Sequence, residues 1–227
     1  MAFQPSITTA RPQIAVSDFI SKVCLWMAGG LAVSALAAFW TLAQPGLMQA
    51  IFTKPALLIG LVIAEFALVI WLSAAYTRMS AGLATSLYFG YAFLNGVTLS
   101  AILIVYTSVS IMITFAVTAG TFLFFAVYGA TTKRDLTSIG GFAVMGLIGI
   151  ILASVVNIFL KSSGLMWVTT FIGIGVFMAL TAWDMQKLKA IHAAGIPNGA
   201  VMGALALYLD FINLFLLLLR IFGRQRN

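Results

Sequence analysis

The sequence contains very little charge. Only 7% of its 227 residues are Asp, Glu, Lys or Arg, whereas 63% are hydrophobic and the mean hydropathy is +1.12. Soluble domains are about half apolar and about a quarter charged, and no soluble fold of this length can bury so much apolar surface. The composition therefore excludes a soluble protein and predicts one that folds in lipid.

Histidine and cysteine are nearly absent, with one residue of each, His192 and Cys24. A single cysteine excludes an intrachain disulfide and a CxxC redox site, and together the two residues exclude a zinc site of the usual ligand set. No GxSxG nucleophile elbow accompanies a base and an orienting acid. We therefore expect no resident cofactor and no enzymatic activity.

Nucleic acid is excluded as a partner by the way the basic residues are spread. The net charge of +7 comes from 12 Lys and Arg against 5 Asp and Glu. The basic residues stand singly, in twos or in threes between apolar stretches, without a basic run or interleaved aromatic residues. This pattern is typical of loop charge that sets the orientation of a membrane protein, whose partner is lipid.

Seven apolar windows are long enough to cross a bilayer core of about 30 Å, which takes about 20 helical residues. They are residues 22–43, 56–78, 83–106, 109–131, 138–160, 165–192 and 199–221. The short connections between them contain proline, glycine, serine and charged residues. We predict an all-α membrane protein with seven transmembrane helices in one domain, residues 18–227. A polar tail, residues 1–17, precedes it, and Ser17 or Asp18 caps the first helix.

Loop charge favours one orientation by a small margin. With the N-terminus inside, seven of the 12 Lys and Arg residues fall on the inner side and five on the outer side. Basic loops are enriched on the cytoplasmic side. We therefore expect a cytoplasmic N-terminus and an external C-terminus, although the basic residues of the C-terminal tail oppose this.

Only three acidic residues fall well inside the predicted helices: Glu65, Asp184 and Asp210. A charge at the bilayer centre costs roughly 2.5–3.5 kcal/mol even on the most lenient scale, so such residues face the bundle interior and have partners. Each is a candidate functional residue, and the alternative is a structural polar contact between helices.

Asp184 and Asp210 are placed to meet. Each lies 13 residues from Pro197, which stands in the predicted turn between the last two helices. In an antiparallel hairpin with a rise of ~1.5 Å per residue, both lie about 20 Å from the turn, at the same depth. Two carboxylates within hydrogen-bond reach share a proton, and their titration belongs to the pair. The aspartate pair, Asp184 and Asp210, is therefore predicted to sense pH near neutrality.

Three further residues are candidates for the same region. Asn213 lies three residues after Asp210, on the same helix face, and is a candidate hydrogen-bond partner. Arg78 ends the second predicted helix and is either a countercharge for the pair or a side chain that extends to the interface. Glu65 lies ~20 Å deeper on that helix. It is a candidate cation or proton site, or bonds a neighbouring helix through Asn95 or a serine.

Several stretches are specific enough to indicate a family. They are residues 204–215 (ALALYLDFINLF), 218–223 (LLRIFG), 128–136 (YGATTKRDL), 156–160 (VNIFL) and 181–189 (TAWDMQKLK). Together they resemble the Bax inhibitor-1 (transmembrane Bax inhibitor motif) family, and the resemblance extends from about residue 17 to the end. The short tail and compact loops resemble a bacterial inner-membrane member.

The resemblance implies a fold in which two three-helix bundles surround a central seventh helix. It also implies a pH-sensitive calcium leak governed by an aspartate pair on helices six and seven, which matches Asp184 and Asp210. The same two residues are the candidate ligands for the transported calcium ion. The family's arginine on helix two aligns with Tyr76, two residues before Arg78, so this chain departs from the pattern there.

Two other functions compete with a calcium leak. One is a non-transporting regulator that binds membrane proteases or stress factors, as some members of the family do. The other is an intramembrane aspartyl protease, in which two aspartates share a proton. Those proteases place GxG before the second aspartate, whereas Leu207-Tyr208-Leu209 precedes Asp210, which argues against that reading. Sequence does not indicate the oligomeric state.

Overall fold

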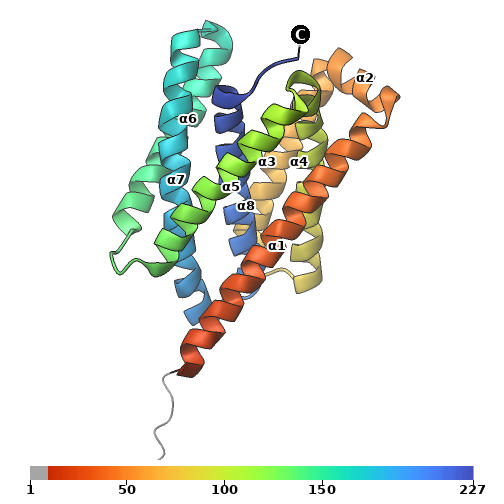
Figure 1. The fold of residues 1–227 in the computed structure, drawn as a ribbon. Coiled ribbons are helices and arrows are strands. Elements are labelled where there is room, and N and C mark those ends of the chain that lie inside the picture. The colour runs from red at the N-terminus through yellow and green to blue at the C-terminus, as the bar shows by residue number, and fades with distance from the viewer. Residues whose placement is uncertain (1–9, 227) are drawn as a thin grey trace, which may run out of the picture.

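The computed structural model describes residues 10–226, which form eight α-helices and no strand (Figure 1). The helices are α1 (Ala10–Leu42), α2 (Pro45–Thr53), α3 (Pro55–Ala75), α4 (Ala81–Val105), α5 (Ser108–Thr131), α6 (Thr137–Leu160), α7 (Ser163–Ala193) and α8 (Gly199–Phe222). Within this range, all except α2 are long and apolar enough to cross a membrane. The predicted all-α fold with seven membrane-spanning helices is confirmed.

The structure corrects the prediction at the start of the chain. Helix α1 begins at Ala10, so Ser17 and Asp18 lie inside it and do not cap it. The predicted tail is thus helical from Ala10 onward, and residues 1–9 lie outside the described part.

Helix α2 is a second feature that the sequence analysis did not predict. The prediction assigned its residues to a connection, because nine residues are too few to span a bilayer and Pro45-Gly46 resembles a breaker. In the structure, Pro45 starts the helix after Gln44. Proline suits this position because the first helical N–H groups have no intrahelical partner. Lys54 then separates α2 from α3.

Hydroxyl caps define several of the other boundaries. The side chains of Ser80, Thr107 and Ser162 accept hydrogen bonds of 3.3 Å from the backbone N–H groups of Leu83, Ser110 and Leu165. Such caps satisfy N–H groups in the first turn of a helix. They start α4, α5 and α7, and the boundary after Tyr106, which the sequence marks most weakly, is confirmed.

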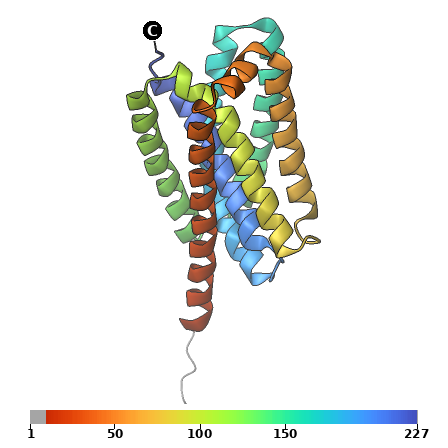
Figure 2. The same ribbon diagram turned by 90° about the vertical axis from the view of Figure 1, so that its right-hand side faces the viewer.

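Helix α8 is the most buried span, with 67% of its apolar window covered. It contacts α1, α4, α5 and α7 (Figure 2). Helix α4 packs on α1 and α3, and α7 packs on α5 and α6. The implied grouping into two three-helix bundles stays a prediction.

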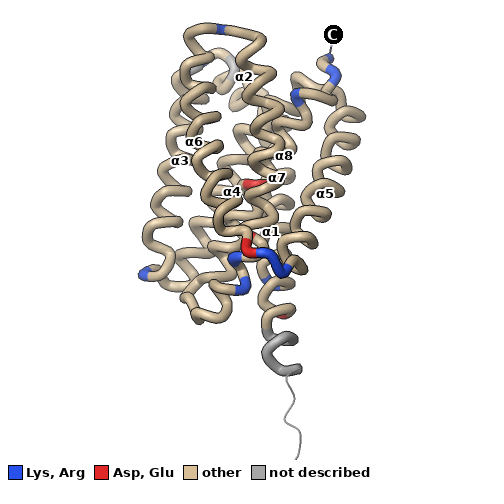
Figure 3. Tube along the Cα trace, turned by 90° about the vertical axis from the view of Figure 1, so that its left-hand side faces the viewer, with Lys and Arg blue, Asp and Glu red and all other residues tan. Residues whose placement is uncertain are grey.

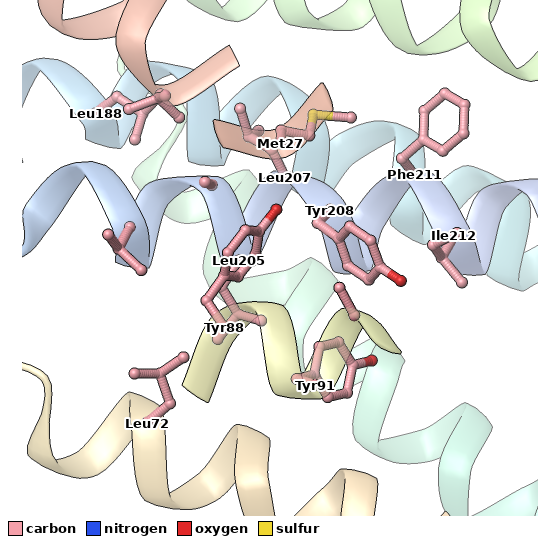
Figure 4. Packing of buried hydrophobic residues seen from close by; sticks show 14 of the residues in the cluster. Met27, Leu72, Tyr88, Tyr91, Leu188, Leu205, Leu207, Tyr208, Phe211 and Ile212 are labelled. Atoms are coloured by element: carbon pink, nitrogen blue, oxygen red, sulfur yellow. The ribbon is translucent and has the colours of Figure 1, made fainter. Parts of the chain in front are cut away.

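Large side chains fill the space around α8. Leu205, Leu207 and Tyr208 are fully buried. Figure 4 shows them together with residues of the neighbouring helices: Met27, Leu72, Tyr88, Tyr91 and Leu188. Gly30 of α1 lies so close to the ring of Tyr88 that a Cβ there would collide with it. A small residue at this point lets α1 and α4 approach, as is usual in membrane bundles.

Charge is confined mainly to the two ends of the bundle. Figure 3 shows Lys and Arg at both ends and almost none along the middle. The C-terminal tail lies at the end opposite the start of α1 (Figure 1). This placement fits a membrane-spanning bundle, and the cytoplasmic location of the N-terminus stays a prediction.

Candidate functional site

The aspartate pair lies between the last two helices. Asp210 is on α8 and is only 4% exposed, and Asp184 is on α7 and is partly buried. The two helices are antiparallel neighbours joined by a short turn that contains Gly195 and Asn198, both with positive φ. The structure therefore brings the two predicted residues to one interface.

The register of the hairpin follows from its closest approaches. A Cβ added to Gly199 would lie 2.6 Å from Ile191, and one added to Gly203 would collide with Leu188. These contacts place the midpoint of the hairpin at about Gly195 and not at Pro197. The expectation of equal depth is therefore wrong: Asp210 lies about one helical turn, ~5 Å, farther from the turn than Asp184.

The opposite tilt of the two side chains compensates for this offset. Cβ atoms point toward the N-terminus of their own helix. The Asp184 side chain therefore leans away from the turn, whereas the Asp210 side chain leans toward it. Both lie on the facing surfaces, since Leu188 follows Asp184 by four residues and Gly203 precedes Asp210 by seven. The two tilts therefore bring the carboxylates of Asp184 and Asp210 toward each other across the α7–α8 interface.

One oxygen of Asp210 lacks a partner. In residues 10–226, no hydrogen bond reaches Asp210 Oδ2, although the atom is buried. Buried polar atoms are nearly always satisfied, and a buried charge without a partner is costly. A proton held by the pair, or a cation bound to it, satisfies such a group. This oxygen is the most unusual polar atom of the site.

A metal ion at the pair would depend on few protein side chains. No group of three or more His, Cys, Asp or Glu side chains gathers anywhere in the described residues. Calcium takes six to eight oxygen ligands. Asp184 and Asp210 therefore offer a cation two carboxylates, and water would supply most of the remaining ligands.

Lys187 lies one turn along α7 from Asp184 and is the cation nearest to it on that helix. Lys187 is exposed, and its Nζ lies 4.8 Å from the centroid of the Trp183 ring. Sequence reasoning missed this residue, although residues three apart on a helix lie on the same face.

Arg78 does not occupy the countercharge position. Helix α3 ends at Ala75, and Arg78 lies exposed in the following turn. Asn198 fixes that turn beneath the α7–α8 connection, because its Nδ2 donates to Tyr76 O at 2.7 Å and to Met79 O at 2.9 Å. Asp210 lies 12 residues beyond Asn198, a rise of ~18 Å. The expectation that Arg78 contacts the pair is therefore not supported.

Asn213 is also engaged elsewhere. Its Nδ2 donates to Leu209 O, one turn earlier on α8, at 2.8 Å. The predicted hydrogen bond to Asp210 does not involve this donor. Asn213 lies on the same helix as Asp210, but its side-chain amide bonds a backbone carbonyl of that helix and not the Asp210 carboxylate.

Glu65 forms a separate polar cluster between α3 and α4. Asn95 Nδ2 donates to Glu65 Oε2 at 3.2 Å, and the Thr98 hydroxyl donates to Oε1. Both carboxylate oxygens of Glu65 thus have partners on the neighbouring helix. The contact with Asn95 is one of the alternatives that the sequence leaves open.

The same cluster continues to the central helix. Tyr208 Oη donates to Asn95 Oδ1 at 2.8 Å and lies 2.6 Å from Ser34 Oγ of α1. Ser34 Oγ also lies 2.7 Å from the backbone oxygen of Ala92. Hydrogen bonds therefore link α3, α4, α8 and α1 at a point two residues from Asp210. Sequence reasoning missed Tyr208, because a tyrosine within an apolar run resembles a core residue.

Two other residues near Asp184 fasten α7 to the α5–α6 connection. Gln186 Nε2 donates to Arg134 O at 2.8 Å, and Leu136 N donates to Gln186 Oε1 at 2.8 Å. Lys189 Nζ donates to Ala130 O near the end of α5. The stretches 128–136 and 181–189, both quoted above for their resemblance, are therefore joined in space.

Asp135 in this connection is an ordinary surface carboxylate. The N–H and hydroxyl of Thr137 donate to Asp135 Oδ1 at 2.9 and 2.6 Å. These bonds hold the pKa of Asp135 below its usual value, so it remains ionised at neutral pH. It provides a control for the two aspartates inside the membrane.

Known proteins resemble this chain over almost its whole length. The family model described as inhibitor of apoptosis-promoting Bax1 matches residues 16–227. An inner membrane protein of Escherichia coli, YbhL, is 47% identical over 99% of both chains. Uncharacterized proteins of Borreliella burgdorferi (42% identical, 97% of this chain and 98% of the relative) and Streptococcus pyogenes (34%, 95% and 96%) are similar too. The chain therefore belongs to the Bax inhibitor-1 family.

Proposed function

We propose that the protein is a pH-sensitive calcium leak of the bacterial inner membrane, gated by the aspartate pair. The observation that carries the proposal is the buried Oδ2 of Asp210 on the central helix, which has no hydrogen-bond partner in residues 10–226 and lies at the interface with α7, the helix of Asp184. The name of the Escherichia coli relative supports the inner-membrane location, and the family resemblance supports the calcium leak.

Protonation of the pair changes the force between α7 and α8. With both carboxylates ionised, the pair carries a charge of about −2 and the two helices repel each other there. One shared proton lowers the charge toward −1 and supplies a hydrogen-bond donor across the interface. Since α7 is fastened to the α5–α6 connection through Gln186, α8 is the element that responds.

The same geometry suits a cation that binds transiently and is then released. Conduction requires binding that is favourable enough for entry and weak enough for release. Two carboxylates supply fewer oxygens than the six to eight that calcium takes, so water retains part of the coordination shell. Protons and calcium then compete for the same oxygens.

A flux assay in liposomes tests the proposal. We expect calcium entry that depends on pH, and we expect Asp184→Asn or Asp210→Asn each to abolish most of that dependence. The double variant should add little, because the proton belongs to both residues. Asp135→Asn, which makes the same change at an exposed carboxylate, should leave the dependence intact.

Two results would contradict the proposal. Additive effects of the two substitutions would show that Asp184 and Asp210 titrate separately. The absence of calcium flux at every pH, from protein shown to be folded, would instead favour a regulator that binds other membrane proteins.

A further inference from the structure

An apolar groove opens on the side of the bundle, between α1 and α5. Its volume is about 450 Å³, and α4 and α8 form its floor. It is lined by Ala28, Ala32 and Ala35 of α1, by Phe115 of α5, and by Phe211 and Phe215 of α8. Ala32 and Ala35 are exposed, and Phe115 is 46% exposed. The groove is therefore open toward the surrounding lipid.

The groove occupies only one half of the membrane. Its residues come from the halves of α1, α4, α5 and α8 that lie nearest the C-terminal tail. Figure 2 shows that end of α8 between α5 and α1. An occupant of the groove thus lies in the leaflet on the side of the tail.

The tail carries two arginines across the mouth of the groove. Thr107 N donates to Arg224 O at 3.0 Å, and Arg226 N donates to Val105 O at 2.9 Å. The Arg224 N–H donates to Ser110 Oγ at 3.0 Å. These backbone bonds hold the tail over the end of α4 and the first turn of α5.

The two arginine side chains remain exposed at this place. Within residues 10–226, the Arg226 guanidinium makes one long hydrogen bond, to Ser108 Oγ at 3.5 Å. Ile111, which lines the groove, lies one turn below Ser108. A positive charge therefore lies about one helical turn from the apolar groove, on the side of the C-terminal tail.

We propose that this groove, lined by Ala28, Ala32 and Ala35 of α1 with Phe115, Phe211 and Phe215, binds one acyl chain of an anionic phospholipid whose phosphate contacts Arg224 and Arg226. The apolar lining suits a hydrocarbon chain and offers almost no partner to a polar ligand. Basic residues at the membrane surface attract anionic headgroups. The small side chains of the three alanines make the groove wide enough for an acyl chain.

Native mass spectrometry of the purified protein tests this site. Delipidated protein in detergent is supplied with dioleoyl phosphatidylglycerol, which is anionic, or with dioleoyl phosphatidylcholine, which is zwitterionic. Ala35→Trp fills the groove, and Leu36→Trp is its control because Leu36 is 70% exposed and lies outside the groove. Arg224→Gln with Arg226→Gln removes the charge at the mouth but keeps the backbone bonds. Lys54→Gln with Lys161→Gln is the control, since it removes the same charge from the same end of the bundle.

We expect one phosphatidylglycerol molecule bound about tenfold more tightly than phosphatidylcholine, as two cations at a headgroup allow. Ala35→Trp should abolish binding of this molecule, and the double arginine variant should abolish the preference. Both controls should bind like the unaltered protein. Unchanged binding in Ala35→Trp, or an equal loss of preference in the lysine control, would overturn the proposal. A dimer that dissociates in Ala35→Trp while lipid binding persists would assign the groove to a second copy and also overturn it.

Discussion

Glu65 and the aspartate pair are both acidic groups inside the membrane-spanning part of the chain, and they are satisfied in different ways. Both oxygens of Glu65 accept hydrogen bonds from α4. Asp210 is more deeply buried, yet its Oδ2 has no hydrogen-bond partner in the described residues. The comparison separates two uses of a buried carboxylate. A group with complete partners holds helices together, whereas a group without them is free to exchange a proton or a cation.

The largest expected difference between the two sites is in stability. Glu65→Gln places an amide N–H against a donor and leaves a buried hydrogen bond unmade, which should cost about 2 kcal/mol. Asp210→Asn breaks no hydrogen bond at Oδ2 and should leave stability unchanged or raise it, because it removes a buried charge. Unfolding followed by tryptophan fluorescence in detergent measures both. Equal destabilisation by the two substitutions would remove the distinction between the sites.

A smaller effect is expected where the Glu65 cluster reaches the central helix. Tyr208→Phe keeps the ring packing but removes the Oη contacts with Asn95 and Ser34. Hydrogen bonds between membrane helices contribute about 0.6 kcal/mol each, so we expect a loss of about 1 kcal/mol in the same assay. Tyr91→Phe is the control, since Tyr91 packs edge-on against Tyr208 in the same core. A loss as large in Tyr91→Phe would show that packing, and not the hydrogen bonds, matters at Tyr208.

The smallest effect concerns the charge beside the pair. Lys187 lies one turn from Asp184 on α7, and a nearby cation favours an ionised carboxylate, so Lys187→Met should let the pair keep its proton to higher pH. The midpoint of calcium flux against pH should move upward. The shift should not exceed about half a pH unit, because Lys187 is exposed and water screens its charge.

Arg78→Ala is the matched comparison for this shift. It removes a cation that lies beyond reach of the pair, and the midpoint should stay in place. A larger shift in Arg78→Ala than in Lys187→Met would restore Arg78 as the countercharge and contradict the position found for it.

The sequence predicts the membrane spans well because each span is a continuous run of about 20 apolar residues, which local composition alone reveals. The window 138–160 became helix Thr137–Leu160, and 109–131 became Ser108–Thr131. Helix α2 was not predicted because a helix of nine residues is too short to give the apolar window of a membrane span. The start of α1 was missed because Arg11, Pro12 and Gln13 are typical of a polar tail.

The candidate site was only partly predictable, for reasons that are geometric. Equal spacing about Pro197 correctly placed Asp184 and Asp210 on facing helices, but their depth depends on a turn in which Gly195 and Asn198 take positive φ. The position of Arg78 depends on hydrogen bonds from Asn198, 120 residues later in the chain. Contacts between residues so distant in sequence cannot be derived from spacing along one helix.

The measurement that tests the shared proton most directly is infrared difference spectroscopy across a pH titration. It detects the carbonyl band of a protonated carboxylic acid. We predict one band that disappears as pH rises and is absent in both Asp184→Asn and Asp210→Asn, but present in Glu65→Gln, because one proton belongs to two residues. A band that survives either aspartate substitution, or one lost only in Glu65→Gln, would contradict a proton shared by the aspartate pair.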